Sequence, residues 1–136
     1  MEAAFAVSWW AIIIAAVVKF LIGWAWYAPP VLGKRWAELS GQSMDGGMSG
    51  MAPAIVVQLI GDLIMAYILA RFIVHYGDPS LVSGAIVGFM AWLGFVATLM
   101  VASMFYEKKP GELIAINAGY QLVGILVMGA IIGWWH

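Results

Sequence analysis

Four long apolar stretches, separated by short polar or proline-containing breaks, make up most of the 136-residue chain. They cover about residues 7–28, 52–74, 81–105 and 113–135. Each stretch is close to the roughly 20 apolar residues that a helix needs to cross the hydrocarbon core of a bilayer. The pattern therefore predicts four transmembrane helices.

The breaks between these stretches carry residues that end helices. Pro29 and Pro30 follow the first stretch, and proline both lacks an amide donor and disfavours helix in the residue before it. The turn sequence Gly77-Asp78-Pro79 separates the second and third stretches, and residues 107–111 separate the third and fourth. Connections this short make consecutive helices antiparallel neighbours. We therefore expect an all-α fold: an integral membrane bundle of four antiparallel transmembrane helices, forming a single domain over residues 1–136.

The first connection is longer than the others and has two parts. In residues 31–40, Leu32, Trp36 and Leu39 have the i, i+4, i+7 spacing of one helix face, and the charged residues lie mostly elsewhere. This pattern is typical of a short amphipathic helix at the membrane interface. Residues 41–50 are rich in glycine and small polar residues, and we interpret them as a flexible linker.

The composition excludes a soluble domain. Apolar residues make up 65% of the chain and charged residues only 10%, whereas charged residues are about 25% of a typical soluble protein. Membrane lipids are therefore the expected surroundings. The net charge of −1 provides no basic field, so we expect no nucleic-acid partner. The absence of cysteine excludes disulfides and cysteine nucleophiles.

The distribution of lysine and arginine predicts the orientation of the bundle. The first and third connections carry Lys34, Arg35, Lys108 and Lys109, whereas the opposite side carries only Arg71, at the end of the second stretch. Short loops with more Lys and Arg remain on the cytoplasmic side of a membrane. We therefore expect the first and third connections in the cytoplasm and both termini outside.

Two charged residues lie deep within the predicted spans. Lys19 is about twelve residues into the first span and Asp62 about ten into the second. At 1.5 Å per residue, both are roughly 13–15 Å from the cytoplasmic end, on neighbouring helices. An isolated charge at that depth costs about 2.5–3.5 kcal/mol or more. Pairing of the two charges, or protonation of Asp62, lowers this cost.

These two charges have several interpretations. In the first, they form a structural ion pair, or a pair neutralised by proton transfer, that fixes which helix faces meet. In the second, they form a protonatable site that faces a cavity and serves the proton-coupled movement of a solute. In the third, Lys19 extends toward the interface or Asp62 faces another subunit.

Uncharged polar residues gather at the same predicted level. Gln58 is one helical turn from Asp62, Thr98 lies at comparable depth in the third span, and Asn117 and Gln121 share a face of the fourth. The outer half of each span is almost purely apolar. This asymmetry indicates a polar pocket that opens inward, with these residues as candidates for a substrate or proton site. The alternative is interhelical hydrogen bonding of about 0.6 kcal/mol per contact, which only holds the helices together.

Two glycine pairs favour close helix contacts. Gly84 and Gly88 lie four residues apart in the third span, and Gly129 and Gly133 in the fourth. Glycines at this spacing let two helix backbones approach closely. They indicate either contacts inside the bundle or the face of a dimer.

Four short motifs follow one another along the chain: Trp26-Tyr27-Ala28-Pro29, Leu32-Gly33-Lys34-Arg35-Trp36, the run from Trp92 to Thr98, and Asn117-Ala118-Gly119-Tyr120. In this order and spacing the chain resembles a family of bacterial membrane proteins catalogued as domain of unknown function 1761. The resemblance covers nearly the whole chain. It implies a four-helix membrane fold, and we expect the bacterial inner membrane as the location. It implies no activity, so no catalytic residue can be transferred from it.

No motif of a known enzyme class is present: the chain has no phosphate-binding glycine loop, no His-Glu-x-x-His and no Gly-x-Ser-x-Gly. We therefore expect no catalytic residues, no metal and no other cofactor. The favoured hypothesis is a small proton-coupled transporter or channel-like protein with an inward-facing pocket centred on Lys19 and Asp62. The alternative is a non-catalytic accessory or scaffold subunit of a larger membrane complex. An enzyme acting on lipid or quinone has the least support. Because four short helices leave little room for a translocation path, we expect a homo-oligomer or a larger membrane complex.

Overall fold

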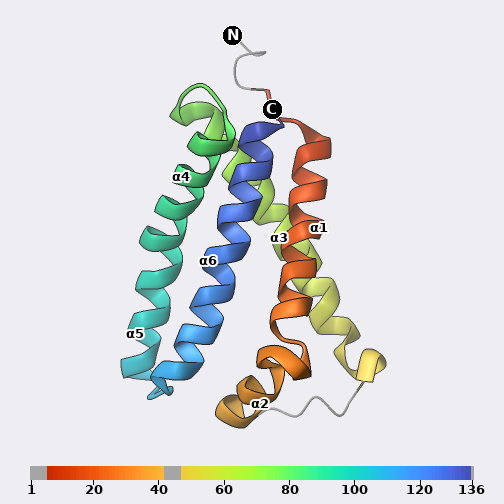
Figure 1. The fold of residues 1–136 in the computed structure, drawn as a ribbon, viewed down its shortest axis with the longest axis vertical. Helices are drawn as coiled ribbons and strands as arrows, with labels where there is room; N and C mark the ends of the chain where they lie inside the picture. Colours follow the sequence, from red (N-terminus) through yellow and green to blue (C-terminus); the bar gives the residue numbers. More distant parts are fainter. Residues whose placement is uncertain (1–5, 42–46, 136) are drawn as a thin grey trace.

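The computed structural model describes residues 6–41 and 47–135, which contain helices and no strand. The long helices stand side by side, each antiparallel to the one before it (Figure 1). Within the described residues, four helices are long and apolar enough to cross a membrane: Trp9–Trp26, Ala52–Tyr76, Leu81–Tyr106 and Gly111–Trp134. The predicted all-α architecture with four apolar helices of spanning length is confirmed.

The first helix, α1 (Trp9–Trp26), begins at Ser8, whose side chain caps the first turn. The two prolines that follow α1 open the next segment, the π-helical turn η2 (Pro29–Gly33). Proline is tolerated there because the first amide groups of a helix have no partner within it. η2 runs directly into α2 (Lys34–Ser40), which ends at Gly41 in the left-handed conformation, with a φ of 73°.

The segment formed by η2 and α2 is the predicted amphipathic helix of the first connection. It begins two residues earlier than residue 31, at the prolines themselves. Leu32, Trp36 and Leu39 are half-buried, whereas the charged side chains of the segment are exposed. The apolar face therefore lies against the bundle.

The second long helix, α3 (Gly47–Tyr76), begins earlier than predicted. The linker predicted over residues 41–50 is wrong for residues 47–50, which form the first turn of α3, and residues 42–46 lie outside the described residues. Glycine disfavours helix by only about 1 kcal/mol per residue, which the continuous helix that follows overcomes. Pro53 also lies inside α3, near its start.

The third predicted span consists of three segments that follow one another without a break: α4 (Leu81–Ala91), the π-helical η3 (Trp92–Ala97) and α5 (Thr98–Tyr106). At its start, Ser80 and Ser83 cap each other's backbone amides reciprocally. The wider π-helical turns lie in the middle of the span, and nothing in the periodicity of the sequence predicted them.

The fourth helix, α6 (Gly111–Trp134), is central and contacts α1, α3 and α4. Where α6 meets α4, a side chain added at Gly129 would overlap the carbonyl oxygen of Gly84, and one added at Gly84 would overlap that of Gly129. At Gly88, an added Cβ would lie 2.8 Å from the carbonyl oxygen of Ile125. The glycine pairs therefore mark a contact inside the bundle.

Small and branched apolar side chains of all four long helices form the core. Its buried members are Ile12, Ala15, Ala16, Ala66, Leu69, Ala70, Ile73, Val87, Ile125, Met128 and Ile132. Because many of them are small, the helices pack closely, and the large apolar side chains are left on the outer surface. Such a surface fits acyl chains rather than water.

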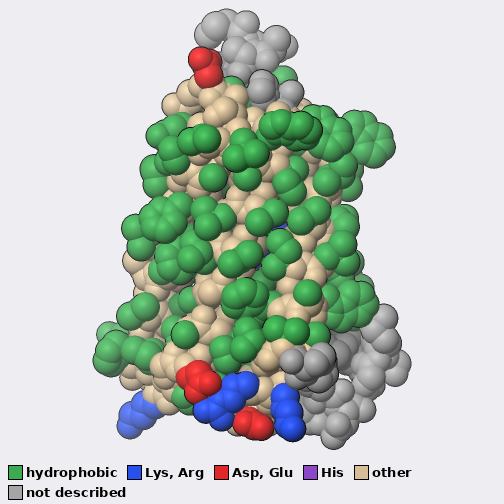
Figure 2. Space-filling model, viewed as in Figure 1, with side chains coloured by type: hydrophobic (Ala, Val, Ile, Leu, Met, Phe, Trp, Pro, Cys, Tyr) green, Lys and Arg blue, Asp and Glu red, His purple; other side chains and the backbone are tan. Residues whose placement is uncertain are grey.

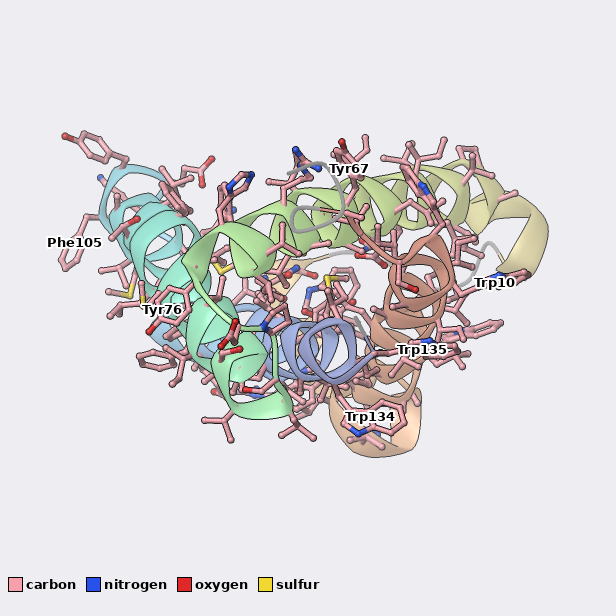
Figure 3. All side chains as sticks on the ribbon, turned by 90° about the horizontal axis from the view of Figure 1, so that it is seen from above. Trp10, Tyr67, Tyr76, Phe105, Trp134 and Trp135 are labelled. Atoms are coloured by element: carbon pink, nitrogen blue, oxygen red, sulfur yellow. The ribbon has the colours of Figure 1, made fainter. Side chains whose placement is uncertain are left out.

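Charged side chains gather at one end of the bundle, at the bottom of Figure 2, and hydrophobic side chains cover most of the rest of this face. This end holds α2 and the connection of residues 107–110 between α5 and α6, and we call it the charged end. At the opposite end, Trp10, Tyr76, Trp134 and Trp135 project outward from the bundle (Figure 3). Exposed aromatic side chains at the end of a helix bundle are typical of a membrane–water interface.

Candidate functional site

Lys19 and Asp62 meet in the interior of the bundle. Lys19 on α1 and Asp62 on α3 are each only 1% exposed, and Lys19 Nζ lies 3.0 Å from Asp62 Oδ1. The two helices are antiparallel neighbours, so residues at equal depth face each other across their contact. The structure thus brings the two intramembrane charges together as an ion pair.

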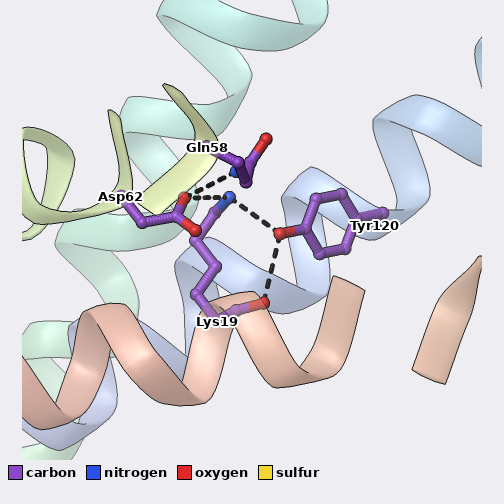
Figure 4. A network of polar contacts seen from close by, with 4 residues as sticks. All are labelled: Lys19, Gln58, Asp62 and Tyr120. Carbon is purple, nitrogen blue, oxygen red and sulfur yellow. Dashed lines mark hydrogen bonds and ion pairs between the residues drawn. The ribbon is translucent and has the colours of Figure 1, made fainter. Parts of the chain in front are cut away.

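Two further side chains complete a hydrogen-bonded network around this pair (Figure 4). The Nζ group of Lys19 donates to the hydroxyl of Tyr120 on α6 at 3.2 Å, and that hydroxyl donates to the backbone carbonyl of Lys19 at 3.1 Å. The Nε2 group of Gln58 donates to Asp62 Oδ1 at 2.9 Å. The network therefore connects α1, α3 and α6 at one level.

Two glycines make room for these side chains. A Cβ added at Gly124 on α6 would lie 2.9 Å from Cγ of Lys19. A Cβ added at Gly23 on α1 would lie 2.8 Å from the hydroxyl oxygen of Tyr120. Both distances are shorter than ordinary van der Waals contact, so the lysine stem and the tyrosine ring occupy the space that glycine leaves open.

One oxygen of Asp62 is left over. Oδ1 accepts from both Lys19 and Gln58, whereas Oδ2 is buried and has no hydrogen-bond partner among the described residues. A buried carboxylate oxygen without a partner is unfavourable, because it has lost water and gained nothing in exchange. The network can therefore accept one more donor at this atom, such as a proton on the carboxyl group itself.

A cavity of about 420 Å³ adjoins the network on the side of the charged end. Gln58 and Tyr120 belong both to the hydrogen-bonded network and to the lining of the cavity, whereas Lys19 and Asp62 are not among the lining residues. Trp24 is 54% exposed, and Gln58 is exposed as well, so the cavity opens between α1 and α3. The residues that line it come from α1, α2, α3 and α6: Phe20, Gly23, Trp24, Tyr27, Trp36, Ala54, Ile55, Gln58, Asn117 and Tyr120.

The side chain of Asn117 also lines the cavity, and Tyr27 positions it. The Tyr27 hydroxyl donates to Asn117 Oδ1 at 2.7 Å, and the Tyr27 ring lies edge-on to those of Trp36 and Tyr120, with centroids 5.9 and 5.5 Å away. The ring contacts join α2 to the wall of the cavity. The amide of Asn117 is thus held in one orientation by a hydrogen bond from the residue that follows α1.

The helix α2 is fixed over this region by an exposed ion pair. Arg35 donates two hydrogen bonds, of 2.8 and 2.6 Å, to the two carboxylate oxygens of Glu112 at the start of α6. Hydrogen bonds to Glu112 and to Glu38 raise the pKa of Arg35 above its ordinary value. The guanidinium therefore stays charged, and Trp36, the next residue, remains at the cavity.

The structure does not bring all six candidates together. Lys19, Asp62 and Gln58 form the network, and Asn117 lies in the adjoining cavity. Thr98 lies apart on the exposed face of α5, where its hydroxyl donates to the carbonyl of Gly94.

Gln121 lies on α6 but is not among the residues that line the cavity. It is half-buried, and its buried Oε1 has no partner in the described part of the chain. Asn117 and Gln121 are four residues apart, yet the face of α6 that meets α1 runs through Asn117, Tyr120 and Gly124. Gln121 falls to one side of that line.

Tyr120 is the member of the hydrogen-bonded network that the sequence did not indicate as a site residue. Its ring suggests an ordinary core residue, whereas its hydroxyl both accepts from and donates to Lys19. The available signal was its position, three residues after Asn117 and four before Gly124, on one face of the last helix.

The fold and this site define a multi-pass membrane protein that holds a buried ion pair beside an open cavity. Residues 10–133 match the model of a family described as proteins of unknown function (DUF1761), and the chain belongs to that family. No curated protein and no solved structure matches the chain.

Three of the four motifs behind the family resemblance, those of Trp26, Trp92 and Asn117, meet around residues 116–120 of α6. The indole Nε1 of Trp26 donates to the carbonyl of Ile116, and that of Trp92 in η3 donates to the carbonyl of Ala118, both at 3.0 Å. A Cβ at Gly119 would lie 3.2 Å from the Trp26 ring. Residues far apart in sequence thus converge on the turn of α6 that carries Asn117 and Tyr120.

Proposed function

We propose that this protein is a small proton-coupled transporter whose solute enters the cavity from the cytoplasmic side. The observation that carries the proposal is the buried ion pair of Lys19 and Asp62, whose hydrogen-bond partners Gln58 and Tyr120 also line the cavity. Ionisable groups inside a membrane are costly and commonly mark proton or substrate pathways. A pair used only for packing would not require an adjoining open space.

The coupling follows from the hydrogen bonds of the network. A proton taken up by Asp62 neutralises the carboxylate and leaves the Lys19 charge without its partner in the bundle interior. Gln58 then loses a charged acceptor, and the Tyr120 hydroxyl is the side-chain group among the described residues that still accepts a hydrogen bond from the ammonium group. Because both residues line the cavity, its polar wall depends on the protonation state of Asp62.

The decisive experiment measures proton movement in proteoliposomes. Liposomes loaded with a pH-sensitive dye are exposed to a panel of small amphipathic solutes, with and without an imposed pH gradient. We expect wild type to move protons together with at least one solute, and Asp62→Asn to remain folded but to lose the coupled flux. Thr98→Val is the matched control, because Thr98 lies on the exposed face of α5 and is expected to leave the flux unchanged. Solute uptake whose rate is independent of both the pH gradient and the membrane potential would disprove the proposal.

A second candidate function is that of an accessory subunit in a larger membrane complex. The observation that favours it is the peripheral position of the span Leu81–Tyr106. Only 11% of an 18-residue apolar stretch of this span is buried inside the bundle, against 39% for Gly111–Trp134. A second membrane protein packed along this helix would cover its large side chains. Stoichiometric co-purification in mild detergent is the expected result for this function, and an active wild-type protein that purifies without a partner contradicts it.

A further inference from the structure

We propose that the cavity binds an uncharged, flat aromatic molecule whose edge carries both a hydrogen-bond donor and an acceptor, as in an aromatic carboxamide. This inference rests on the proposed role of the cavity as a solute site and names the chemical class of the solute. It follows from three properties of the cavity: its walls, its polar groups and its charge.

The walls of the cavity suit a flat ring. Phe20 and Trp24 come from successive turns of α1, Tyr27 follows directly after the last residue of α1, and Trp36 comes from α2. These rings meet each other at tilted or edge-on angles, 56° between Phe20 and Trp24 and 74° between Tyr27 and Trp36. Aromatic side chains attract other aromatic rings by stacking and edge-to-face contact. The volume of about 420 Å³ lies at the lower end of the range of ligand pockets and accommodates a two-ring molecule.

The two amide side chains of the cavity offer opposite polar groups. Asn117 uses its Oδ1 to accept from Tyr27, which leaves its Nδ2 group as a donor outside this bond. Gln58 uses its Nε2 to donate to Asp62, which leaves its Oε1 as an acceptor outside this bond. They lie on different helices, α6 and α3. A ligand with a carbonyl oxygen and an adjacent N–H group matches one donor and one acceptor.

The charge of the cavity favours a neutral molecule. Among the described residues, none of those that line it carries a formal charge. The two nearest charges, Lys19 and Asp62, lie behind Gln58 and Tyr120 and neutralise each other at 3.0 Å. An organic cation or anion would lose its hydration without finding an unpaired opposite charge.

The test measures equilibrium binding of radiolabelled 2-naphthamide to the full chain in lipid nanodiscs, with empty nanodiscs subtracted to remove partition into lipid. Three competitors keep the same ring: methyl 2-naphthoate, which only accepts, the 2-naphthoate anion, and the cation N,N,N-trimethyl-2-naphthylammonium. We expect saturable binding of the amide, with the ester about tenfold weaker, which corresponds to one lost hydrogen bond. Both ions are expected to compete more weakly than the ester. Tighter competition by either ion, or no saturable amide binding, overturns the inference.

Asn117→Asp provides a sharper variant. The aspartate still accepts from Tyr27, but it removes the amide donor and adds a negative charge to the cavity. We expect the amide to bind about tenfold more weakly and the cation to become the tightest of the four probes. An unchanged order of affinities would show that the probes bind elsewhere and would overturn the inference.

Wall and control variants complete the design. Trp36→Leu is expected to weaken amide binding, whereas Trp134→Leu, at the opposite end of the bundle and 67% exposed, is expected to leave it unchanged. Equal effects of the two substitutions contradict the proposed location. Because binding is measured without a gradient, amide binding without coupled proton flux refutes the transport proposal alone. Coupled flux of other solutes, without amide binding, refutes this inference alone.

Discussion

At the scale of single residues, the site depends on a charge pair that only a close match in depth makes possible. The rise of 1.5 Å per residue predicts from the sequence that Lys19 and Asp62 lie at one level. It could not show which face of each helix carries the charge. Nor could it show that Tyr120 contacts Lys19, because a tyrosine within an apolar helix looks in the sequence like an ordinary core residue. The contact of this hydroxyl with Lys19 depends on the space at Gly23, which is a tertiary property.

Removing the lysine tests the pair directly. We expect Lys19→Met to lower the free energy of unfolding by about 3–5 kcal/mol, because it leaves the buried Asp62 carboxylate without a counter-charge. Adding Asp62→Leu to this variant should recover most of the loss, since a buried pair replaced by apolar side chains is often tolerated. Unfolding by SDS in mixed micelles gives both values. Lys34→Met, on the exposed face of α2, is the matched control. Equal destabilisation of the single and double variants would contradict this account.

The tyrosine hydroxyl contributes less, and its loss can be measured in the same assay. We expect Tyr120→Phe to cost about 1 kcal/mol, because the variant keeps the ring and loses one donated and one accepted hydrogen bond with Lys19. Tyr106→Phe serves as the control, since Tyr106 is 90% exposed at the end of α5. A Tyr120→Phe variant as stable as wild type would mean that the hydroxyl does not support the ammonium group.

At the scale of helices, the length of the apolar stretches predicted where the helices begin more reliably than local composition did. The spans at Leu81 and Gly111 begin within two residues of the predicted positions, because the bilayer sets their length. The start of α3 was predicted too late, since its glycine-rich first turn has the composition of a linker. The π-helical segments at Pro29 and Trp92 have no sequence period of their own. The second of them carries a contact with another helix, the hydrogen bond of Trp92 to the carbonyl of Ala118 on α6.

The glycine contact between α4 and α6 makes a prediction at this scale. A methyl group at Gly129 would overlap the carbonyl oxygen of Gly84, which belongs to a backbone that cannot move aside without separating the helices. We expect Gly129→Ala to lower the free energy of unfolding by about 1–3 kcal/mol. Gly61→Ala on α3 is the matched control, because a Cβ there meets no atom within 4 Å. A loss of dimers with unchanged monomer stability would instead show that the glycines form an intermolecular face.

At the scale of the whole molecule, the two halves of the bundle differ in chemistry. The cavity and its polar groups lie in the half next to the charged end, with the ion pair at their inner limit, and the core cluster of small apolar residues extends to the opposite end. The same charged end carries Lys34, Arg35, Lys108 and Lys109. If basic connections face the cytoplasm, the cavity lies in the cytoplasmic half of the bundle, with its opening between α1 and α3. The direction of the proposed transport therefore depends on the orientation of the protein in the membrane.

The orientation can be determined by labelling single cysteines, because the chain has no cysteine of its own. Gly77→Cys places a thiol in the turn between α3 and α4, and Tyr106→Cys places one at the charged end. Both positions are exposed, and neither substitution changes the number of lysines or arginines that orients the chain. In intact bacterial spheroplasts, a membrane-impermeant maleimide should label the cysteine at position 77, and label that at position 106 only after the cells are permeabilised. The reverse pattern would place the cavity in the outer half of the membrane. The prediction of an inward-facing solute site would then be wrong, even if the ion pair, the cavity and the proton coupling were all retained.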